Sequence, residues 1–430
     1  MPASADLLAD LEARGLVHDL TDRAALGGRL AEGPMTLYHG IDPSADSLHV
    51  GNLVGILVLR RFQRFGHRPI ALAGGATGMI GDPGGRSSER NLLDPDTLGA
   101  NLAGIKGQLE QLLDFGAGSR SAELVDNASW TGELRLLDFL RDVGKHATVN
   151  AMVAKESVRA RMQGDEGISF TEFAYMLVQA NDFLWLHEHE GCDLQVGGSD
   201  QWGNITAGID LVRRRVGRRV HGLTWPLLLR SDGRKFGKSE GGNEDVWLSA
   251  SRTTPYRFFQ HWMQVADADV GRFLLQLTLL DLEEARSVIA AHSAAPERRV
   301  GQRRLAQELT TLVHGADAAT AAADAAHALF GADLESLPPG ALAALDGEVD
   351  TTALGAGRLA EGLDLAALLN ETDLATSLSD ARRVVKGGGV YVNNVRATVD
   401  VTVTAQDLRG GRYLLLRRGR HTHHLVRFDP

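Results

Sequence analysis

Two short segments of this chain carry side chains that suit phosphate binding. The first runs from Tyr38 to Asn52 and includes Ser44, His49 and Asn52, which can donate hydrogen bonds to phosphate oxygens. The second reads Lys235-Phe236-Gly237-Lys238-Ser239 and places two lysines three residues apart. Lysines on a loop can close over a polyphosphate as point charges. The two segments lie far apart in the sequence, so the fold must bring them together.

Residue types alone leave a plainer interpretation open. The chain has no Gly-x-Gly-x-x-Gly after the first predicted strand and no Gly-x-x-x-x-Gly-Lys-Ser/Thr phosphate loop. The lysine pair lies in a polar, glycine-rich stretch from Ser231 to Asn243, which is also typical of a solvated loop. By itself, the pattern does not decide between a phosphate site and such a loop.

Strands that alternate with helices are predicted to position the first segment. Apolar runs predict strands at 35–40, 69–73, 122–125, 193–196 and 223–229, and helices at 53–65, 131–141, 145–160, 170–187 and 201–215. This order predicts an α/β fold with a doubly wound, Rossmann-like parallel sheet. Ligands bind at the carboxyl ends of the strands of such a sheet, and helix N-termini there favour anions. We therefore expect the Tyr38–Asn52 segment to lie at a ligand site.

The helix predicted at 170–187 has two different faces. Its apolar face carries Phe170, Phe173, Ala174, Leu177, Leu184 and Trp185. On the opposite face, Tyr175, Gln179 and Asp182 fall within about 60° of one another. This polar group either faces solvent or lines a pocket, and the pattern alone favours solvent.

Charge is unevenly distributed over the 430 residues, whose net charge is −10. Residues 381–430 contain ten Lys and Arg against three Asp, a net charge of +7, so the rest of the chain carries −17. The overall acidity argues against a chain coated with cationic surface for nucleic-acid binding. A basic region on an acidic body suggests one module that contacts a polyanion, and the alternative is a small domain that happens to be basic.

Composition also suggests domain boundaries. Residues 254–330 predict helices only, and Pro338-Pro339-Gly340 interrupts the alanine-rich helix that precedes it. The predicted division is a catalytic domain at 1–230, a loop and connector at 231–253, a helical domain at 254–331, a linker at 332–355 and a small α+β domain at 356–430.

Other features exclude several classes of protein. The single cysteine, Cys192, rules out an internal disulfide framework and a cysteine-based zinc site. The N-terminus lacks the features of a signal peptide, and no apolar run is long enough to span a membrane, so we expect a cytoplasmic protein. His421, His423 and His424 could hold a metal, but an exposed or RNA-facing tail is the favoured interpretation.

Three motifs together carry a resemblance to a known family. The Tyr38–Asn52 segment, Gly74–Pro83 and Gln195–Asn204 resemble the bacterial tyrosyl-tRNA synthetases, members of class I of the aminoacyl-tRNA synthetases. The paired signatures of that class, "HIGH" and "KMSKS", match the two segments described first. The second histidine of "HIGH" is Asn52 here, which keeps an N–H donor but has no cationic form. The second signature keeps both lysines, and the resemblance runs from about Leu7 to the C-terminus.

The resemblance implies that the chain activates L-tyrosine with ATP and transfers it to the terminal adenosine of its tRNA(Tyr). It implies catalytic roles for Ser44, His49, Asn52, Lys235 and Lys238. It implies tyrosine binding by Tyr38, Asp82, Tyr175, Gln179, Asp182, Gln195 and Gln201. It implies ATP binding by Gly40, Asp42, Gly51, Arg86, Arg90, Gly198, Asp200 and Ser239. Mg²⁺ is expected to accompany ATP, without a metal held by the protein.

Residues 363–428 resemble a small RNA-binding module found in a ribosomal small-subunit protein and in bacterial tyrosyl-tRNA synthetases. The signature of this module is the stretch Ser379–Asn394. The predicted RNA-binding residues are Arg213, Arg214, Arg382, Arg383, Lys386, Asn393 and Arg396. For the Arg213 cluster, a solvated helix end is an equally good interpretation. The resemblance also implies a homodimer with residues 139–170 near the interface.

Two alternatives remain within reach of the sequence. A tryptophanyl-tRNA synthetase would share the fold, but Tyr38 paired with Asp182 and the C-terminal module favour tyrosine. A non-catalytic RNA-binding paralogue is the second alternative, and the intact Lys235–Ser239 segment, Asp82 and Asp200 argue against it.

Overall fold

The computed structural model describes residues 7–80, 94–155, 158–159, 162, 167–233, 236, 245–338, 340–398 and 401–430. The chain forms two compact units. The first comprises the residues up to Arg252 together with Val265–Gly301, and the second comprises Thr253–Gln264 and Gln302–Pro430. The five predicted segments are a finer division of the chain, and they remain a prediction.

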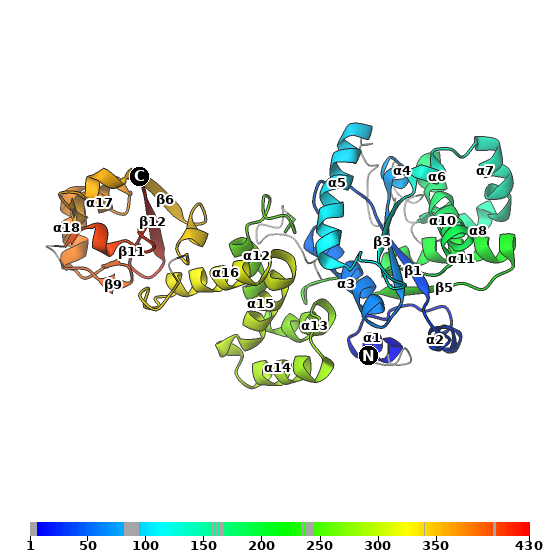
Figure 1. Ribbon diagram of the computed structural model, residues 1–430, viewed down its shortest axis with the longest axis horizontal. Coiled ribbons are helices and arrows are strands. Elements are labelled where there is room, and N and C mark those ends of the chain that lie inside the picture. The colour runs from blue at the N-terminus through cyan, green and yellow to red at the C-terminus, as the bar shows by residue number, and fades with distance from the viewer. Residues whose placement is uncertain are drawn as a thin grey trace. The chain divides into compact units, whose positions relative to one another are not determined.

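The first unit is built on a five-stranded parallel sheet in the order β3-β2-β1-β4-β5. Its strands are β1 (Thr36–Ile41), β2 (Arg68–Ala73), β3 (Glu123–Asp126), β4 (Cys192–Gly198) and β5 (His221–Trp225). The order reverses between β1 and β4, so right-handed crossovers must place helices on both faces. Figure 1 shows α3 and α5 on one side of this sheet and α10 and α11 on the other.

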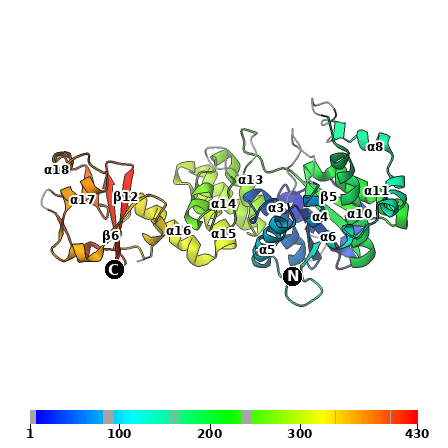
Figure 2. The ribbon, with the colours of Figure 1, turned by 90° about the horizontal axis from the view of Figure 1, so that it is seen from above.

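The helices of the first unit are α1 (Leu7–Ala13), α2 (Arg23–Ala31), α3 (Val50–Arg64), α4 (Gly75–Gly78), α5 (Pro95–Leu112), α6 (Ala128–Thr131), α7 (Leu136–Asp142), α8 (Val149–Val153), α10 (Phe170–Glu190), α11 (Trp202–Val216), α13 (Asp267–Leu277) and α14 (Leu282–Ala294). The described residues of this unit also form the short 3-10 helices η2 (Gly144–His146), η3 (Ser199–Gln201) and η4 (Pro296–Arg298). Helices α10 and α11 lie side by side in both views (Figures 1 and 2).

Local sequence explains where the key helices begin and end. His49 caps the N-terminus of α3 in a reciprocal arrangement with Asn52, and Ser169 and Glu172 form the same kind of capping box at α10. Helix α10 ends at Gly191, whose φ of 62° is left-handed. These signals fix the start of both helices that carry the predicted site residues.

The second unit contains a helical part and a second sheet. Its helices are α12 (Pro255–Met263), α15 (Val300–His314), α16 (Ala316–Leu329), α17 (Leu365–Glu371) and α18 (Leu378–Lys386), with the 3-10 helices η5 (Ala343–Leu345), η6 (Ala356–Leu359) and η7 (Ala405–Asp407). Its strands are β6 (Asp350–Gly355), β7 (Leu363–Asp364), β8 (Val390–Val392), β9 (Val395–Arg396), β10 (Thr402–Val403), β11 (Tyr413–Arg418) and β12 (Thr422–Asp429). Five strands form a mixed sheet in the order β6-β12-β11-β8-β9, and β10 pairs with β7.

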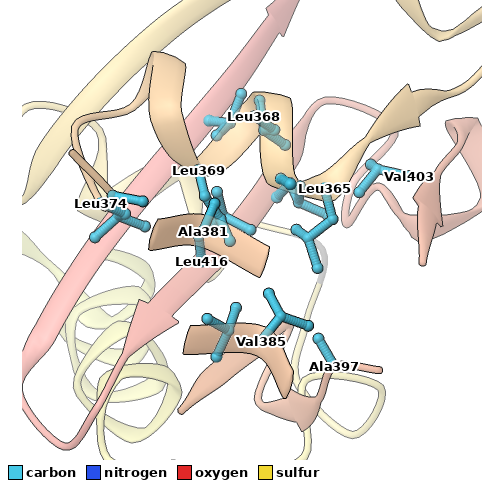
Figure 3. Packing of buried hydrophobic residues seen from close by; sticks show 14 of the residues in the cluster. Leu365, Leu368, Leu369, Leu374, Ala381, Val385, Ala397, Val403 and Leu416 are labelled. Atoms are coloured by element: carbon cyan, nitrogen blue, oxygen red, sulfur yellow. The ribbon is translucent and has the colours of Figure 1, made fainter. Parts of the chain in front are cut away.

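One face of this mixed sheet packs against α17 and α18. Figure 3 shows Leu365, Leu368 and Leu369 of α17 directed toward Ala381 of α18 and Leu416 of β11. These side chains are buried together with apolar residues from the neighbouring strands. The C-terminal module therefore has its own hydrophobic core.

Most predicted elements are confirmed, and some ends are corrected. All five predicted strands of the first sheet are present, and residues 254–330 contain helices only. The last strand ends at Trp225 instead of residue 229, because Pro226 has no N–H to donate to the ladder. The helix predicted at 131–141 is two helices, α6 and α7. Of the prediction at 145–160, the structure describes η2 and α8, and part of the remainder lies outside the described residues.

Candidate functional site

A cavity of about 370 Å³ opens at the carboxyl ends of β1 and β4. It is lined by the N-terminus of α3, by one face of α10 and by the turn from β4 into α11. The predicted residues that line it are Tyr38, Gly40, Asp42, Ser44, His49, Gly51, Asn52, Tyr175, Gln179, Asp182, Gln195, Gly198, Asp200 and Gln201. The fold thus brings together residues from three separated sequence motifs, at the place where parallel α/β sheets bind ligands.

The buried end of the cavity combines a phenol with a carboxyl group. Tyr38 and Asp182 are both completely buried. Asp182 accepts hydrogen bonds from Asn127 Nδ2 at 2.9 Å and from Trp130 Nε1 at 2.8 Å. Burial raises the pKa of Asp182 to about 7, although both hydrogen bonds act in the opposite direction. Near neutral pH, this carboxyl can therefore either accept or donate a hydrogen bond.

Three buried polar atoms of the cavity lack a hydrogen-bond partner among the described residues. They are Tyr38 Oη, Gln179 Oε1 and Gln195 Oε1. A buried polar atom without a partner is unfavourable by about 1–3 kcal/mol, so such atoms gathered in one cavity point to a polar ligand. A ligand with a hydroxyl group and a cationic amine could satisfy all three.

The N-terminus of α3 presents donors to the other end of the cavity. His49 Nδ1 accepts a hydrogen bond from the Gly51 N–H at 3.0 Å, so the neutral ring carries its proton on Nε2. Asn52 Oδ1 accepts a hydrogen bond from the His49 N–H at 3.0 Å, which leaves the amide Nδ2 as the donor of this side chain. A Cβ on Gly51 would lie 2.7 Å from His49 Cε1, so glycine is needed for the ring to fold over the helix end. Two side-chain donors and a helix N-terminus at one edge of the cavity suit an anionic ligand.

The turn after β4 contains a second glycine that leaves space for a ligand close to the backbone. A Cβ on Gly198 would lie 2.6 Å from Asp200 Oδ1 and 3.2 Å from Leu227. Gln201 Oε1 accepts hydrogen bonds from Gln179 at 3.4 Å and from Asn204 at 3.0 Å. The missing side chain at Gly198 therefore leaves space beside the exposed carboxylate of Asp200.

The chain that follows the second signature is hydrogen-bonded to the first signature segment, Tyr38–Asn52. The Val50 N–H donates to the Val246 carbonyl at 2.9 Å, and the Leu248 N–H donates to the Leu48 carbonyl at 2.8 Å. The Trp247 ring packs edge-on against His49, with 6.1 Å between ring centroids. Arg252 lies 4.7 Å above the Trp247 ring. The residues that follow the second signature are thereby held at the N-terminus of α3, beside His49.

The entry of the same segment is attached to α13. The Ser231 N–H donates to Asp269 at 3.0 Å, and Phe236 packs against Phe273 with 4.4 Å between centroids. Phe236 belongs to the second signature and is buried. Both ends of the segment are therefore bound within the first unit. The predicted site residues Asp82, Arg86, Arg90, Lys235, Lys238 and Ser239 lie outside the described residues.

The predicted RNA-binding residues lie in two places. Arg213 pairs with Asp210 at 3.0 Å, and Arg214 donates to the His146 carbonyl at 2.9 Å, both at the surface of the first unit. In the second unit, Arg382, Arg383, Lys386 and Arg396 are exposed on α18 and β9.

Asn393 does not fit its predicted role in RNA binding. It is 6% exposed, donates to the Asp407 carbonyl and accepts from the Leu415 N–H at 3.0 Å. Its φ of 47° lies in the left-handed region that asparagine tolerates in turns. We correct this prediction: Asn393 holds the β8–β9 turn to β11.

Sequence reasoning missed the side chains that support the cavity. Asn127 and Trp130 follow β3 and hold Asp182, but no motif marks them in the sequence. His39 and Trp225 also line the cavity, and burial lowers the pKa of His39 to about 4, which keeps it neutral. The apolar face predicted for α10 needs one correction, because Phe170 is 78% exposed.

The described residues show neither a metal-binding cluster nor a membrane-spanning helix. Among them, no group of three or more His, Cys, Asp or Glu side chains is arranged to hold a metal ion. His424 donates to or accepts from Thr352 at 2.8 Å and is buried, whereas its neighbour His423 lies on the opposite face of β12. None of the helices in the described part of the chain has the length and apolar character needed to cross a bilayer.

Comparison with known families identifies two matching regions. Residues 30–331 match the family model described as tRNA synthetases class I (W and Y). Residues 348–426 match the model described as the tyrosine–tRNA ligase SYY-like C-terminal domain. Together, the two matches span the helical part and both sheets.

Individual proteins are similar over nearly the whole chain. A tyrosine–tRNA ligase of Opitutus terrae is 52% identical over 423 residues, covering 98% of this chain and 99% of that protein. A tyrosine–tRNA ligase of Roseiflexus castenholzii is 51% identical with the same coverage. Among solved structures, a C-terminally truncated mitochondrial tyrosyl-tRNA synthetase of Aspergillus nidulans has a TM-score of 0.68 and 32% identity, covering 75% of this chain and 94% of that chain.

Proposed function

The chain belongs to the tyrosine–tRNA ligase family within class I of the aminoacyl-tRNA synthetases, and we propose that it activates L-tyrosine with ATP and then transfers tyrosine to the terminal adenosine of its tRNA. In the first step, a tyrosine carboxylate oxygen attacks the α-phosphorus of ATP, tyrosyl-adenylate forms and pyrophosphate leaves. In the second step, a ribose hydroxyl of the tRNA attacks the carbonyl of the adenylate, and AMP leaves.

The observation that carries the choice of tyrosine is the buried pair at the end of the cavity. Tyr38 Oη has no partner among the described residues, and the Asp182 carboxyl acts electrostatically on it. A phenolic hydroxyl can donate to Asp182 and accept from Tyr38, whereas phenylalanine would leave both groups unpaired. A site built around a substrate hydroxyl rejects the analogue that lacks it, because the buried polar groups of the site then lose their partners.

The remaining tyrosine-binding roles follow from charge and hydrogen bonding. We assign the ammonium group to Tyr175 and Gln179, together with Asp82, and the activated carboxyl region to Gln195 and Gln201. The unpartnered Oε1 atom of Gln179 supports its assignment, because an ammonium group donates three hydrogen bonds.

The ATP-binding roles place phosphates at the N-terminus of α3 and the nucleoside beside β4. His49 Nε2, the Asn52 amide and Ser44 would donate to phosphate oxygens, with Lys235 and Lys238 as cations from the second signature. The ATP-binding set is completed by Gly40, Asp42, Gly51, Arg86, Arg90, Gly198, Asp200 and Ser239. Asp200 would accept hydrogen bonds from the ribose.

Positioning and electrostatic stabilisation are sufficient for the activation step. The tyrosine carboxylate is ionised at pH 7, so no general base is required. The donors around the phosphates would bind most tightly when negative charge moves onto the leaving pyrophosphate. Mg²⁺ would enter with ATP, held by phosphate oxygens and water, and would neutralise charge on the phosphates.

The test of this function is tyrosine-dependent exchange of pyrophosphate into ATP, with tryptophan and phenylalanine as control amino acids. Wild-type protein is expected to exchange with tyrosine only. Tyr38→Phe and Asp182→Asn are expected to narrow the preference for tyrosine over phenylalanine. Exchange driven equally well by tryptophan would refute the proposed substrate, and unchanged preference in both variants would refute the roles of Tyr38 and Asp182.

We also propose a homodimer with residues 139–170 near its interface. Several exposed apolar side chains of the first unit lie in this range or just before it, namely Leu136, Leu137, Leu140, Val149, Met162 and Phe170. Exposed apolar clusters of this kind mark protein interfaces. Sedimentation equilibrium at micromolar concentration is expected to give twice the chain mass of 46.2 kDa, and a species of the single-chain mass would contradict the dimer.

The C-terminal module is proposed to bind the tRNA. The exposed side chains Arg382, Arg383 and Lys386 of α18 and Arg396 of β9 support this role, and we retain Arg213 and Arg214 as candidates for a second contact. The five-part division of the chain given by the sequence is likewise kept as a proposal.

A further inference from the structure

The mixed sheet of the second unit has two faces with different coverage. Leu414 and Leu416 of β11 belong to the core formed with α17 and α18. Leu415 and Leu425, which pair across β11 and β12, belong instead to a second cluster with Ala325 and Ala328 of α16. Alternation along the strands explains this division, because successive side chains point to opposite faces. Helix α16 therefore covers one face of the sheet at the level of Leu415 and Leu425.

The next row of side chains on this face lies beyond the end of α16. Arg417 pairs with His423 on one side and with Tyr391 on the other, and Tyr391 pairs with Arg396. Directly paired residues share a face, and Arg417 is two residues from Leu415, so all four side chains lie on the face that α16 covers. We call His423, Arg417, Tyr391 and Arg396 the cross-strand row.

The cross-strand row alternates aromatic and cationic groups. The Arg417 guanidinium lies 3.8 Å from the centroid of the Tyr391 ring, which is a cation–π contact. Arg417 Nε is buried and has no hydrogen-bond partner among the described residues. Arg396 Nε donates to the Gly388 carbonyl at 2.8 Å, which directs its guanidinium toward the end of α18. Within the described residues, neither Arg417 nor Arg396 has a carboxylate within 4.0 Å, in contrast to Arg427, which pairs with Asp346.

Phe330 borders this row at the end of α16. It is 84% exposed, more than any other large apolar side chain in the described part of the chain. Asn394, at the tip of the β8–β9 turn, donates to the carbonyls of Ala328 and Ala332 at 2.7 and 2.9 Å. The turn that carries Phe330 is therefore held at the β8–β9 end of the cross-strand row.

An exposed aromatic ring beside a guanidinium stacked on tyrosine suits one kind of ligand. Unpaired bases stack on aromatic rings and on Arg guanidinium planes, and cationic side chains follow the attached phosphates. The +7 net charge of residues 381–430 supplies the complementary charge. An apolar protein partner would find only one large exposed ring here, surrounded by cations.

We propose that Phe330 and the cross-strand row form a stacking platform for an unpaired base of the tRNA. This inference rests on the proposed function, because it assigns a contact to the RNA substrate of that function. It adds Phe330, Tyr391 and Arg417 to the RNA surface, none of which is among the RNA-binding residues predicted from the sequence. Phe330 supplies the ring on which the base stacks, and Arg396 contacts the adjacent phosphate.

The experiment measures binding of a tRNA(Tyr) transcript to the full-length chain and to variants of Phe330. Phe330→Ala is expected to raise the Kd about tenfold, which corresponds to the loss of one base stack. Phe330→Trp is expected to retain wild-type affinity. Phe330→Leu is the matched control, because it keeps an apolar side chain without an aromatic face, and it is expected to behave like the alanine variant.

Two further measurements separate stacking from charge. The slope of log Kd against log salt concentration is expected to stay unchanged in Phe330→Ala and to fall by about 1 in Arg396→Ala. Phe330→Ala is expected to bind a single-stranded oligoribonucleotide more weakly than the wild-type protein does. It is expected to bind a fully paired RNA duplex of the same length with wild-type affinity.

The outcomes that overturn the platform are distinct from a failure of the proposed function. Tyrosine-dependent pyrophosphate exchange needs no tRNA, so it must be unchanged in every Phe330 variant. If wild-type protein lacks this exchange, the proposed function fails. If exchange is present, the platform alone is refuted by a Kd of Phe330→Ala within twofold of wild type, by full rescue in Phe330→Leu, or by a variant that changes self-association without changing tRNA binding.

Discussion

Asp182 offers the most demanding test of the pocket, through the substitution Asp182→Asn. The carboxyl group is completely buried, and burial raises its pKa to about 7 from an ordinary value of 3.8. Because the pKa is higher in the folded state, the folded protein holds a proton that the unfolded chain has already lost between these pH values. The stabilising effect of that proton is complete below pH 3.8 and is lost as the pH rises through 7.

The magnitude follows from the separation of the two pKa values. Each pH unit between them lowers the free energy of unfolding by about 1.4 kcal/mol. From pH 5 to pH 8, the wild-type protein should therefore lose about 3 kcal/mol through Asp182. The variant carries an amide at this position, which does not ionise, so its free energy of unfolding does not fall in this way. It carries a constant penalty of about 1–3 kcal/mol instead, because its amide cannot accept from both Asn127 and Trp130.

The assay is urea unfolding of both proteins without tyrosine at several pH values. Trp130 and Trp185 are stacked with 4.1 Å between ring centroids, so near-ultraviolet circular dichroism of this pair reports on the first unit. Ionisable groups that both proteins share contribute equally to the two free energies of unfolding, so their contributions cancel in the difference. We expect this difference to shift by about 3 kcal/mol in favour of Asp182→Asn between pH 5 and pH 8.

A matched control comes from Asp94, which caps α5. Hydrogen bonds from Thr97 hold the pKa of Asp94 below its usual value, so it does not titrate above pH 5. Asparagine also caps helices well, and Asp94→Asn should give a difference from wild type that is flat from pH 5 to pH 8. A flat difference for Asp182→Asn as well would show that Asp182 ionises normally in the folded protein and would refute the reasoning.

Three further predictions concern catalysis, each measured by pyrophosphate exchange. Trp247→Leu removes the ring that packs against His49 and should lower kcat roughly tenfold while leaving the Kd for tyrosine unchanged. A raised Kd for tyrosine would contradict a role for Trp247 at the phosphate-binding end of the cavity. Gly198→Ala places a Cβ 2.6 Å from Asp200 Oδ1 and should raise the KM for ATP about tenfold, so an unaltered KM for ATP would show that the space is not used. Lys238→Ala should lower the rate of activation with tyrosine affinity nearly unchanged, and a large loss of tyrosine binding would rule out its assignment to the phosphates.

The sequence determined the architecture of the first unit because its signals are local. The alternation of strands and helices predicted the parallel sheet, and Asn52 three residues after His49 lies where a capping side chain is needed. The three motifs that line the cavity are contiguous segments, so their members could be recognised before the fold was known. The basic C-terminal region was likewise visible from a count of charges.

Contacts between distant segments were decided only by the tertiary structure. Asn127 and Trp130 hold Asp182 across more than fifty residues of chain, and Trp247 reaches His49 from the far side of the second signature. The polar side of α10 illustrates the difference well. Its helical spacing was clear, but periodicity says only which residues share a face. In the structure Tyr175 and Asp182 of the polar face are buried, whereas Leu184 is the one buried member of the predicted apolar face.

The proposed RNA surface likewise combines residues that a sequence motif marks with a residue that only the tertiary structure brings there. Lys386 lies in a recognisable signature and Arg396 follows it by two residues, whereas Phe330 is distant from it in the sequence and is brought to the sheet by the Asn394 hydrogen bonds. Asn393 was predicted to contact RNA from its position in the signature, but its side chain is buried in the structure. Sequence spacing determines which side chains are available along an element, and packing between elements determines which of them are left to meet a ligand.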